Sequence, residues 1–226
     1  MTWIDLGDPV PKPTLDEYTP IQWDIGEVVY LSSPKNTINQ SFTDVIDSRV
    51  SLRNFGFITE PQFEEFLWHS CRTRGIGAST LGFDLEHRAS PSAGAIHPIH
   101  VIIKRPQDVQ WWLYQPQTHS LAELKQESAK LIGLEGYAKE VLDGAQAVTM
   151  LFLAEHGKTL VKYQNGCSLI WRDAGALIGI MALIATAMDL SFCPLGITGE
   201  PWASDLAQKG KLVGVGLAFL GSSTRA

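Results

Sequence analysis

Residues 88–98 read Arg-Ala-Ser-Pro-Ser-Ala-Gly-Ala-Ile-His-Pro, and this stretch carries most of the information about the fold. Ser92, Ala93 and Gly94 are small, and Pro91 fixes the backbone immediately before them. A flat ring could therefore lie close against this backbone. An ordinary turn leading into a strand at 100–104 would use the same residues, so the stretch alone leaves both interpretations open.

A second segment, Arg49-Val-Ser-Leu-Arg53, offers fixed positive charge earlier in the chain. A planar guanidinium can bind two oxygens of a phosphate at once. If the segment is extended, Arg49, Ser51 and Arg53 share a face; if it is helical, only the two arginines do. Asp47 lies nearby, so ion pairs between neighbouring side chains are the alternative to a phosphate site.

In this order and spacing, the two segments resemble the FMN-dependent nitroreductase family. They are most similar to its SagB/McbC-type dehydrogenases, which oxidise thiazolines and oxazolines during the biosynthesis of azole-containing peptides. The resemblance covers roughly residues 43–221. Beyond residues 91–98 it includes the following segments: Trp111-Trp-Leu-Tyr114, Lys162-Tyr163, Asp173-Ala-Gly175 and Pro194-Leu-Gly196.

The resemblance implies a role for each matching position. Arg49, Ser51 and Arg53 would face the phosphate and ribityl chain of FMN, and residues 91–94 would lie against the flavin ring. The backbone of Leu195 and Gly196 would face flavin N5, where an N–H stabilises the negative charge of the reduced ring.

Lys162 and Tyr163 match a Lys-Tyr pair that is implicated in catalysis by azoline dehydrogenases. A buried lysine has a lowered pKa and could act as the base. The family continues with a glycine and an arginine-rich run, whereas this chain continues Gln-Asn-Gly-Cys-Ser over residues 164–168. The alternative is an exposed lysine and a half-buried tyrosine where a helix begins. Arg225 is a further candidate for a phosphate contact, with a charged terminal tail as its alternative.

The composition indicates one ordinary globular domain. The chain has 226 residues, of which 45% are hydrophobic and 19% charged, enough for a substantial core. Its net charge of −6 argues against nucleic acid as a partner, because phosphate backbones are bound by dense Lys and Arg. Nothing in the composition supports a membrane-surface role.

The cysteines and histidines argue against disulfides and metals. Cys71, Cys167 and Cys193 form no Cys-x-x-Cys pair, and the N-terminus has no basic segment, so we expect a reduced cytoplasmic protein. His97 and His100 would point to opposite faces of a strand, and no further ligand lies near them in the sequence. We therefore predict no metal.

Residues 1–40 are predicted to form an irregular arm, and residues 41–226 a single FMN-binding domain. Five of the twelve prolines fall within the first 34 residues. Thr59-Glu-Pro-Gln62 predicts a helix start with a capping box, and Ser41 or Thr43 caps a shorter helix. Strands are predicted at 111–114, 147–154 and 213–220, and the last two should be central because they are apolar throughout.

The apolar run 174–188 predicts a long helix. Its 15 residues are fewer than the roughly 20 that span a bilayer, and Asp189 closes it, so a buried core helix is the better interpretation. The resemblance places this helix at a dimer interface. An apolar helix left bare would otherwise expose a large patch.

The sequence thus predicts an α+β nitroreductase-like fold, with a mostly antiparallel sheet, in a homodimer that binds FMN between its subunits. The expected function is flavin-dependent oxidation of a thiazoline, an oxazoline or a related carrier- or peptide-linked substrate, with dioxygen reoxidising the flavin. A peptide substrate would have to be delivered by a partner enzyme. NAD(P)H-dependent reduction of nitro compounds or quinones is the alternative, and a non-catalytic flavin-binding subunit is a second one.

Overall fold

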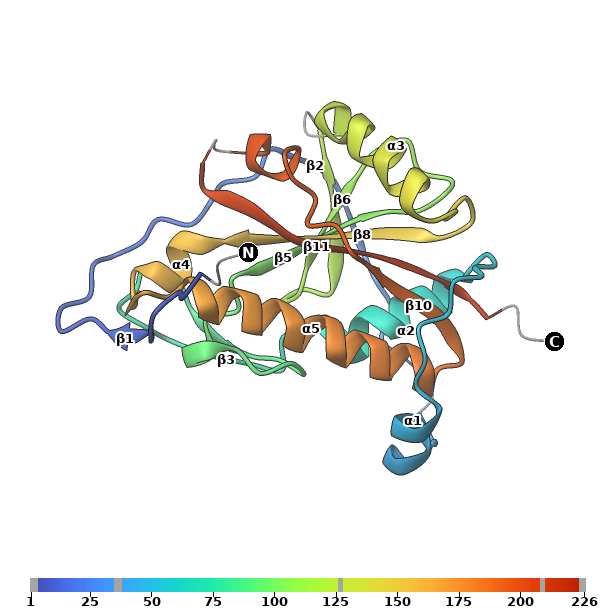
Figure 1. The fold of residues 1–226 in the computed structure, drawn as a ribbon, viewed down its shortest axis with the longest axis horizontal. Helices are drawn as coiled ribbons and strands as arrows, with labels where there is room; N and C mark the ends of the chain where they lie inside the picture. Colours follow the sequence, from blue (N-terminus) through green and yellow to red (C-terminus); the bar gives the residue numbers. More distant parts are fainter. Residues whose placement is uncertain (1–3, 35–37, 126–127, 208–209, 224–226) are drawn as a thin grey trace.

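The computed structural model describes residues 4–34, 38–125, 128–207 and 210–223 (Figure 1). Arg225 lies outside these residues. The main sheet has seven strands in the order β10-β11-β8-β5-β6-β7-β2, and every neighbouring pair is antiparallel. In sheet order they are β10 (Leu190–Leu195), β11 (Leu212–Ser222), β8 (Val148–Glu155), β5 (Ile99–Lys104), β6 (Trp112–Gln115), β7 (Ser120–Leu124) and β2 (Ile25–Tyr30).

The remaining elements surround this sheet. Two small sheets pair β1 (Val10–Pro11) with β9 (Tyr163–Gln164), and β3 (Gly75–Gly77) with β4 (Leu85–His87). The α-helices are α1 (Phe42–Ser48), α2 (Glu60–Cys71), α3 (Ile132–Val141), α4 (His156–Leu160) and α5 (Cys167–Ala187). Single turns of 3-10 helix are η1 (Ala93–Ala95), η2 (Ser128–Leu131) and η3 (Ala203–Asp205). The predicted α+β class is confirmed.

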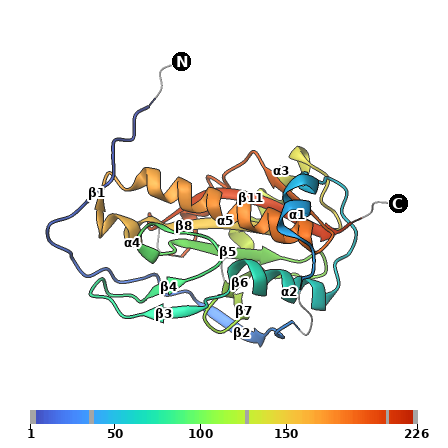
Figure 2. The same cartoon turned by 90° about the horizontal axis from the view of Figure 1, so that it is seen from below.

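Helices cover both faces of the sheet, so two apolar cores form (Figures 1 and 2). α2 and α5 pack on one face, and α3 packs on the other. Alternate residues of β8 enter the two cores: Met150 and Phe152 the first, Leu151 and Leu153 the second. This two-sided burial explains why 147–154 and 213–220 are apolar throughout, and both strands are interior to the sheet as predicted.

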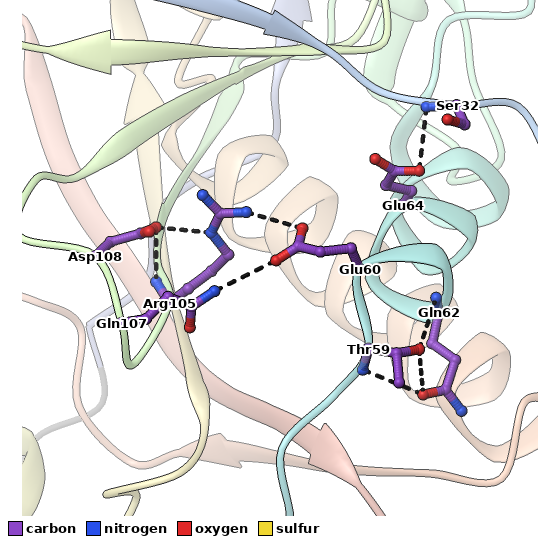
Figure 3. A network of polar contacts seen from close by, with 8 residues as sticks. All are labelled: Ser32, Thr59, Glu60, Gln62, Glu64, Arg105, Gln107 and Asp108. Carbon is purple, nitrogen blue, oxygen red and sulfur yellow. Dashed lines mark hydrogen bonds and ion pairs between the residues drawn. The ribbon is translucent and has the colours of Figure 1, made fainter.

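α2 begins as its sequence predicts. Thr59 Oγ1 accepts a hydrogen bond from the Gln62 backbone, and the Gln62 side chain accepts one from the Thr59 backbone, which completes the capping box. Figure 3 shows how the same end is joined to the turn after β5, where Arg105 contacts both Glu60 at 2.9 Å and Asp108 at 2.7 Å. The buried face of α2 consists of Phe63, Phe66, Leu67, Ser70 and Cys71. Ser41 caps α1.

The N-terminal arm is irregular only in part, because β2 forms an edge strand of the main sheet. The five prolines lie at positions 9, 11, 13, 20 and 34, and the segment between the last two contains the strand-forming run Ile25–Tyr30. The rest of the arm is hydrogen-bonded along the body. Lys12 donates to the Lys162 carbonyl at 2.9 Å, Tyr18 to the Leu81 carbonyl at 2.8 Å, and Ile21 to Glu155 Oε1 at 2.7 Å.

α5 is longer than the apolar run from which it was predicted, because it already begins at Cys167. Its 21 residues make it the one described helix that is long and apolar enough to cross a membrane by length and composition. One face packs into the first core through the following residues: Ile170, Asp173, Ala174, Leu177, Met181 and Ala185. The opposite face is open, since Trp171 is 47% exposed and Gly175 and Gly179 have no atom within 4 Å of an added Cβ.

Candidate functional site

The loop at 91–95 is anchored to α5 by a buried carboxylate. Ser92 Oγ donates to Asp173 Oδ2 at 2.5 Å, and the Ala93 backbone N–H donates to Asp173 Oδ1 at 3.1 Å. Ser92 Oγ in turn accepts from the His97 backbone at 2.9 Å. Burial raises the pKa of Asp173, and the hydrogen bonds from Ser92 and Ala93 oppose that rise. The loop is therefore fixed on the helix before any ligand binds.

The backbone of this loop is strained and tightly surrounded. Gly94, Ala95 and His97 have φ values of 64°, 58° and 47°, in the left-handed region. A Cβ on Gly94 would lie 2.7 Å from Lys162 Nζ and 2.9 Å from Tyr163 Oη. The structure therefore brings the Pro91–Gly94 loop and the Lys162-Tyr163 pair into contact, although 68 residues separate Gly94 from Lys162 in the sequence.

Lys162 and Tyr163 are both partly buried, and the arm holds their backbone. Tyr163 pairs with Pro11 in the β1–β9 ladder, next to the hydrogen bond from Lys12 to Lys162. The Lys162 ammonium lies 5.6 Å from the centre of the Tyr163 ring. No local pattern predicts that the N-terminal arm holds this pair in place, because the contact joins segments about 150 residues apart.

Arg49, Ser51 and Arg53 are exposed in an irregular segment after α1. Neither guanidinium forms an ion pair or hydrogen bond with the residues that the structure describes, so the alternative of local pairing with Asp47 is absent there. The intervening Val50 and Leu52 line a hollow of about 170 Å³ at the C-terminal end of α5. Its other lining residues are Gln40, Ser48, Thr186, Asp189 and Leu190.

The arginine segment and the 91–94 loop lie at opposite ends of α5 within one chain. The loop is bonded to Asp173, whereas the hollow beside the arginines is lined by Thr186. Thirteen residues of helix separate these two, which corresponds to about 20 Å at 1.5 Å per residue. Figure 1 shows α1 near one end of α5, with β1 and α4 near the other. A single chain thus presents the two halves of the predicted site separately.

Leu195 and Gly196 lie at the far end of β10 from the arginine hollow. Leu190 lines that hollow, and five residues of strand carry the chain about 17 Å away to Leu195. Leu195 is half-buried and pairs with Leu217, while Gly196 is exposed. An added Cβ on Gly196 would meet no atom within 4 Å, so its backbone is open to a ligand.

Two pairs of charged or polar side chains lie behind the 91–94 loop, and no pattern in the sequence indicated them. Arg88 contacts Glu86 at 2.8 Å, and His100 contacts Glu155 at 2.8 Å. Burial alone would raise the pKa of Glu86, but Arg88 and hydrogen bonds outweigh it and lower the value to about 2. Among the described residues, no three His, Cys, Asp or Glu side chains are grouped so as to hold a metal ion.

Glu86→Gln is expected to flatten the acid dependence of stability. The folded pKa of about 2 lies below the ordinary value of 4.5, so the stabilisation is present above pH 4.5 and lost as the pH falls toward 2. At about 1.4 kcal/mol per pKa unit, the loss is on the order of 3 kcal/mol. Urea unfolding at several pH values would measure it, with exposed Glu140→Gln as the control. Parallel curves for wild type and Glu86→Gln would contradict the assignment.

Comparison with known proteins places this arrangement in a family. A sequence model described as the nitroreductase family matches residues 46–208, which is most of the chain. The chain belongs to the nitroreductase family. No curated protein matches the sequence significantly. Solved structures confirm the fold, and all those cited below are at most 20% identical to this nitroreductase-family chain.

Two similar structures are described as nitroreductases. The protein from Ralstonia eutropha JMP134 has a TM-score of 0.64 and 20% identity, over 97% of this chain and 100% of that one. The protein from Anabaena variabilis ATCC 29413 has a TM-score of 0.64 and 18% identity, over 92% of this chain but 42% of that one.

Two further structures contain a bound molecule. The Escherichia coli microcin synthetase McbBCD complex, solved with truncated pro-MccB17 bound, has a TM-score of 0.61 and 16% identity, over 88% of this chain and 79% of that one. A nitroreductase from Desulfovibrio desulfuricans was solved with FMN. It has a TM-score of 0.52 and 17% identity, over 83% of this chain and 92% of that one.

The nitroreductase family is FMN-dependent, and the side chains of this member fit that cofactor. Arg49 and Arg53 are exposed donors without a protein acceptor, which suits a phosphate group. At the other half of the site, Gly94 leaves room that any larger residue would fill, beside the Lys162 ammonium. The chain is therefore an FMN oxidoreductase of this family.

Proposed function

We propose that two copies of this chain share each FMN site. Arg49, Ser51 and Arg53 of one copy bind the phosphate and ribityl chain, and residues 91–94 of the second copy lie against the ring. The backbone of Leu195 and Gly196 faces flavin N5. The support for this arrangement is the separation of about 20 Å along α5 between the two halves in one chain.

The open face of α5 supports a homodimer formed through this helix. Glycine lowers helix stability by about 1 kcal/mol relative to alanine, yet Gly175 and Gly179 stand one turn apart on this face. A second helix could approach closely there. In a two-fold dimer with the helices antiparallel, the C-terminal end of one α5 lies near the N-terminal half of the other. The arginine segment then reaches the partner's loop.

For the reaction, we propose dehydrogenation of a thiazoline or oxazoline to the aromatic azole. The observation that carries this proposal is the convergence of Lys162 Nζ and Tyr163 Oη on Gly94 of the ring-binding loop. FMN bound against residues 91–94 would supply the hydride acceptor for this reaction. The accompanying proton must go to a base beside the ring, and Lys162 Nζ and Tyr163 Oη are the polar atoms nearest to an added Cβ on Gly94.

A carrier- or peptide-linked substrate would come from a partner enzyme. The McbBCD structure shows one protein of this fold within a synthetase complex. We infer a comparable supply for this chain from that likeness. A cytoplasmic location suits its three free cysteines, Cys71, Cys167 and Cys193.

Anaerobic titration of the flavoprotein separates the proposed reaction from its alternatives. A 2-aryl-thiazoline-4-carboxamide should bleach the visible flavin absorption and yield the thiazole in equal amount, whereas NADPH should leave the colour unchanged. Rapid bleaching by NADPH alone, with no reaction of the thiazoline, would establish the nitro- or quinone-reductase function instead. Yellow protein that reacts with neither would be a flavin-binding subunit.

Lys162→Met should lower the rate of thiazoline oxidation by about 10²-fold or more, the usual contribution of a general base, and keep FMN bound. Single-turnover flavin reduction measures the chemical step separately from reoxidation. Tyr163→Phe keeps the ring and removes only the hydroxyl, so comparing the two variants identifies the proton acceptor. Lys139→Met, at an exposed position of α3, is the control. Unchanged reduction in both site variants would remove the pair from the mechanism.

A further inference from the structure

A cavity of about 290 Å³ lies where the main sheet opens between β5 and β6. Only Ile102–Leu113 and Ile103–Trp112 are paired between these strands, although β5 begins at Ile99. Residues 99–101 on one side and 114–118 on the other therefore line a gap instead of continuing the ladder. This cavity lies behind the 91–94 loop, and Arg88 and His97 also line a much smaller space beneath that loop.

Among the residues that the structure describes, Glu86 is the one carboxylate that lines the cavity, and protein donors already occupy it. Glu86 accepts from Thr73 Oγ1, from Gln117 Nε2 at 3.0 Å, and from Arg88 Nε and Nη2 at 2.8 Å each. Four donors thus occupy its two oxygens. Arg88 uses only part of its guanidinium for this pair, so its remaining N–H groups stay available to a second acceptor.

Lys158 is a cation with no acceptor beside it. Its ammonium lies 4.7 Å from the centre of the Phe83 ring and forms no ion pair or hydrogen bond with the described residues. Burial lowers the pKa of Lys158, and the positive charge of Arg88 lowers it further, although Glu155 opposes the shift. Lys158 is partly buried, and an anion placed beside its ammonium would offset the cost of that burial.

The remaining polar walls carry little charge at neutral pH. Burial and the charge of Arg88 lower the pKa of His97 to about 4, and burial lowers that of His100. The rest of the lining is aromatic, aliphatic or uncharged polar: Trp23, Cys71, Ile99, Val101, Leu113, Tyr114, Gln115, Pro116, Gln117, Thr118 and Leu177. The cavity therefore has both apolar and uncharged polar walls, with two cations and one fully occupied carboxylate.

We propose that this cavity binds a small carboxylate with an apolar or aromatic body, held by Lys158 and the free N–H groups of Arg88. The volume of about 290 Å³ suits a compact acid. This site is separate from the ring half of the FMN site, because its lining includes none of residues 91–94, Lys162 and Tyr163.

Benzoate and benzamide test the proposal on the FMN-loaded protein, because the two have the same shape and differ in charge. Calorimetric titration should show benzoate binding at least tenfold more tightly than benzamide. Lys158→Met should remove this preference by weakening benzoate tenfold or more, with little change for benzamide. Lys139→Met, the exposed control on α3, should bind both as the wild type does.

The position of the ligand must also be established, since an aromatic acid could stack on the flavin. A crystal structure with 4-bromobenzoate should place the bromine between β5 and β6, and binding should leave the visible flavin spectrum unchanged. Bromine over the flavin ring would overturn the proposal. Absence of benzoate binding would overturn it as well, as would equal binding by wild type and Lys158→Met.

Discussion

Replacing both Arg49 and Arg53 by glutamine should lower FMN affinity by roughly a hundredfold or more. Hydrogen bonds to charged groups contribute about 1.5–3 kcal/mol each, so losing one from each guanidinium costs at least about 3 kcal/mol. Each 1.4 kcal/mol corresponds to a factor of ten in affinity. Quenching of FMN fluorescence on titration with cofactor-free protein measures the change.

The control for this pair is Arg74→Gln, since Arg74 is also exposed and lies close to β3. It should bind FMN as the wild type does. The fold should survive in both proteins because, among the described residues, these exposed arginine side chains form no ion pair. If the double variant kept its FMN affinity, the phosphate site would have to lie elsewhere.

Gly179→Leu should convert the protein to a monomer and thereby abolish tight FMN binding. An added side chain at this position projects from the open face of α5, where it would separate two closely packed helices. Leucine is a better helix former than glycine by about 0.8 kcal/mol, so the helix itself should not be weakened. Sedimentation equilibrium gives the oligomeric state, and the absorption of the purified protein gives its FMN content.

Gly136→Leu on α3 provides a matched control. Gly136 is also an exposed helical glycine with no atom within 4 Å of an added Cβ, but α3 covers the opposite face of the sheet. This variant should remain dimeric and yellow. A monomeric Gly179→Leu protein that retained full FMN affinity would show that one chain is sufficient for the cofactor.

Elements with a local or periodic signal were predicted well from the sequence. The capping box at Thr59 and the apolar residues that follow it predict α2. The unbroken apolar runs predict that β8 and β11 lie inside the sheet. β2 was missed because the prolines around it dominated the interpretation of residues 1–40. Its pairing partner, β7, is about ninety residues away, so no local pattern marks the strand.

The candidate site was predicted as a set of segments but not as an arrangement in space. The packing of α5 determines three features of this arrangement. It brings Gly94 into contact with the Lys162-Tyr163 pair, and it lets Asp173 anchor Ser92. It also sets the distance from these groups to Arg53. Asp173 appeared in the sequence only as the start of an apolar helix. No sequence pattern indicated a role for Lys158, because it meets Arg88 only in the cavity where the sheet opens between β5 and β6.

The claim that each site is shared between two chains can be tested by combining two defective variants. The Arg49→Gln/Arg53→Gln protein lacks the phosphate half, and Gly94→Val blocks the ring half, since its Cβ would lie 2.7 Å from Lys162 Nζ. Each should bind little FMN alone. In a mixed dimer with shared sites, one site receives both intact halves and the other receives both defective ones.

FMN binding by an equal mixture of the two variants, unfolded and refolded together, is therefore the most direct measurement. About half of the dimers are mixed and each has one intact site, so the account predicts recovery of about one quarter of the wild-type FMN content. If each site were built within a single chain, every site would carry a defect. No recovery above the two separate variants would contradict the shared site.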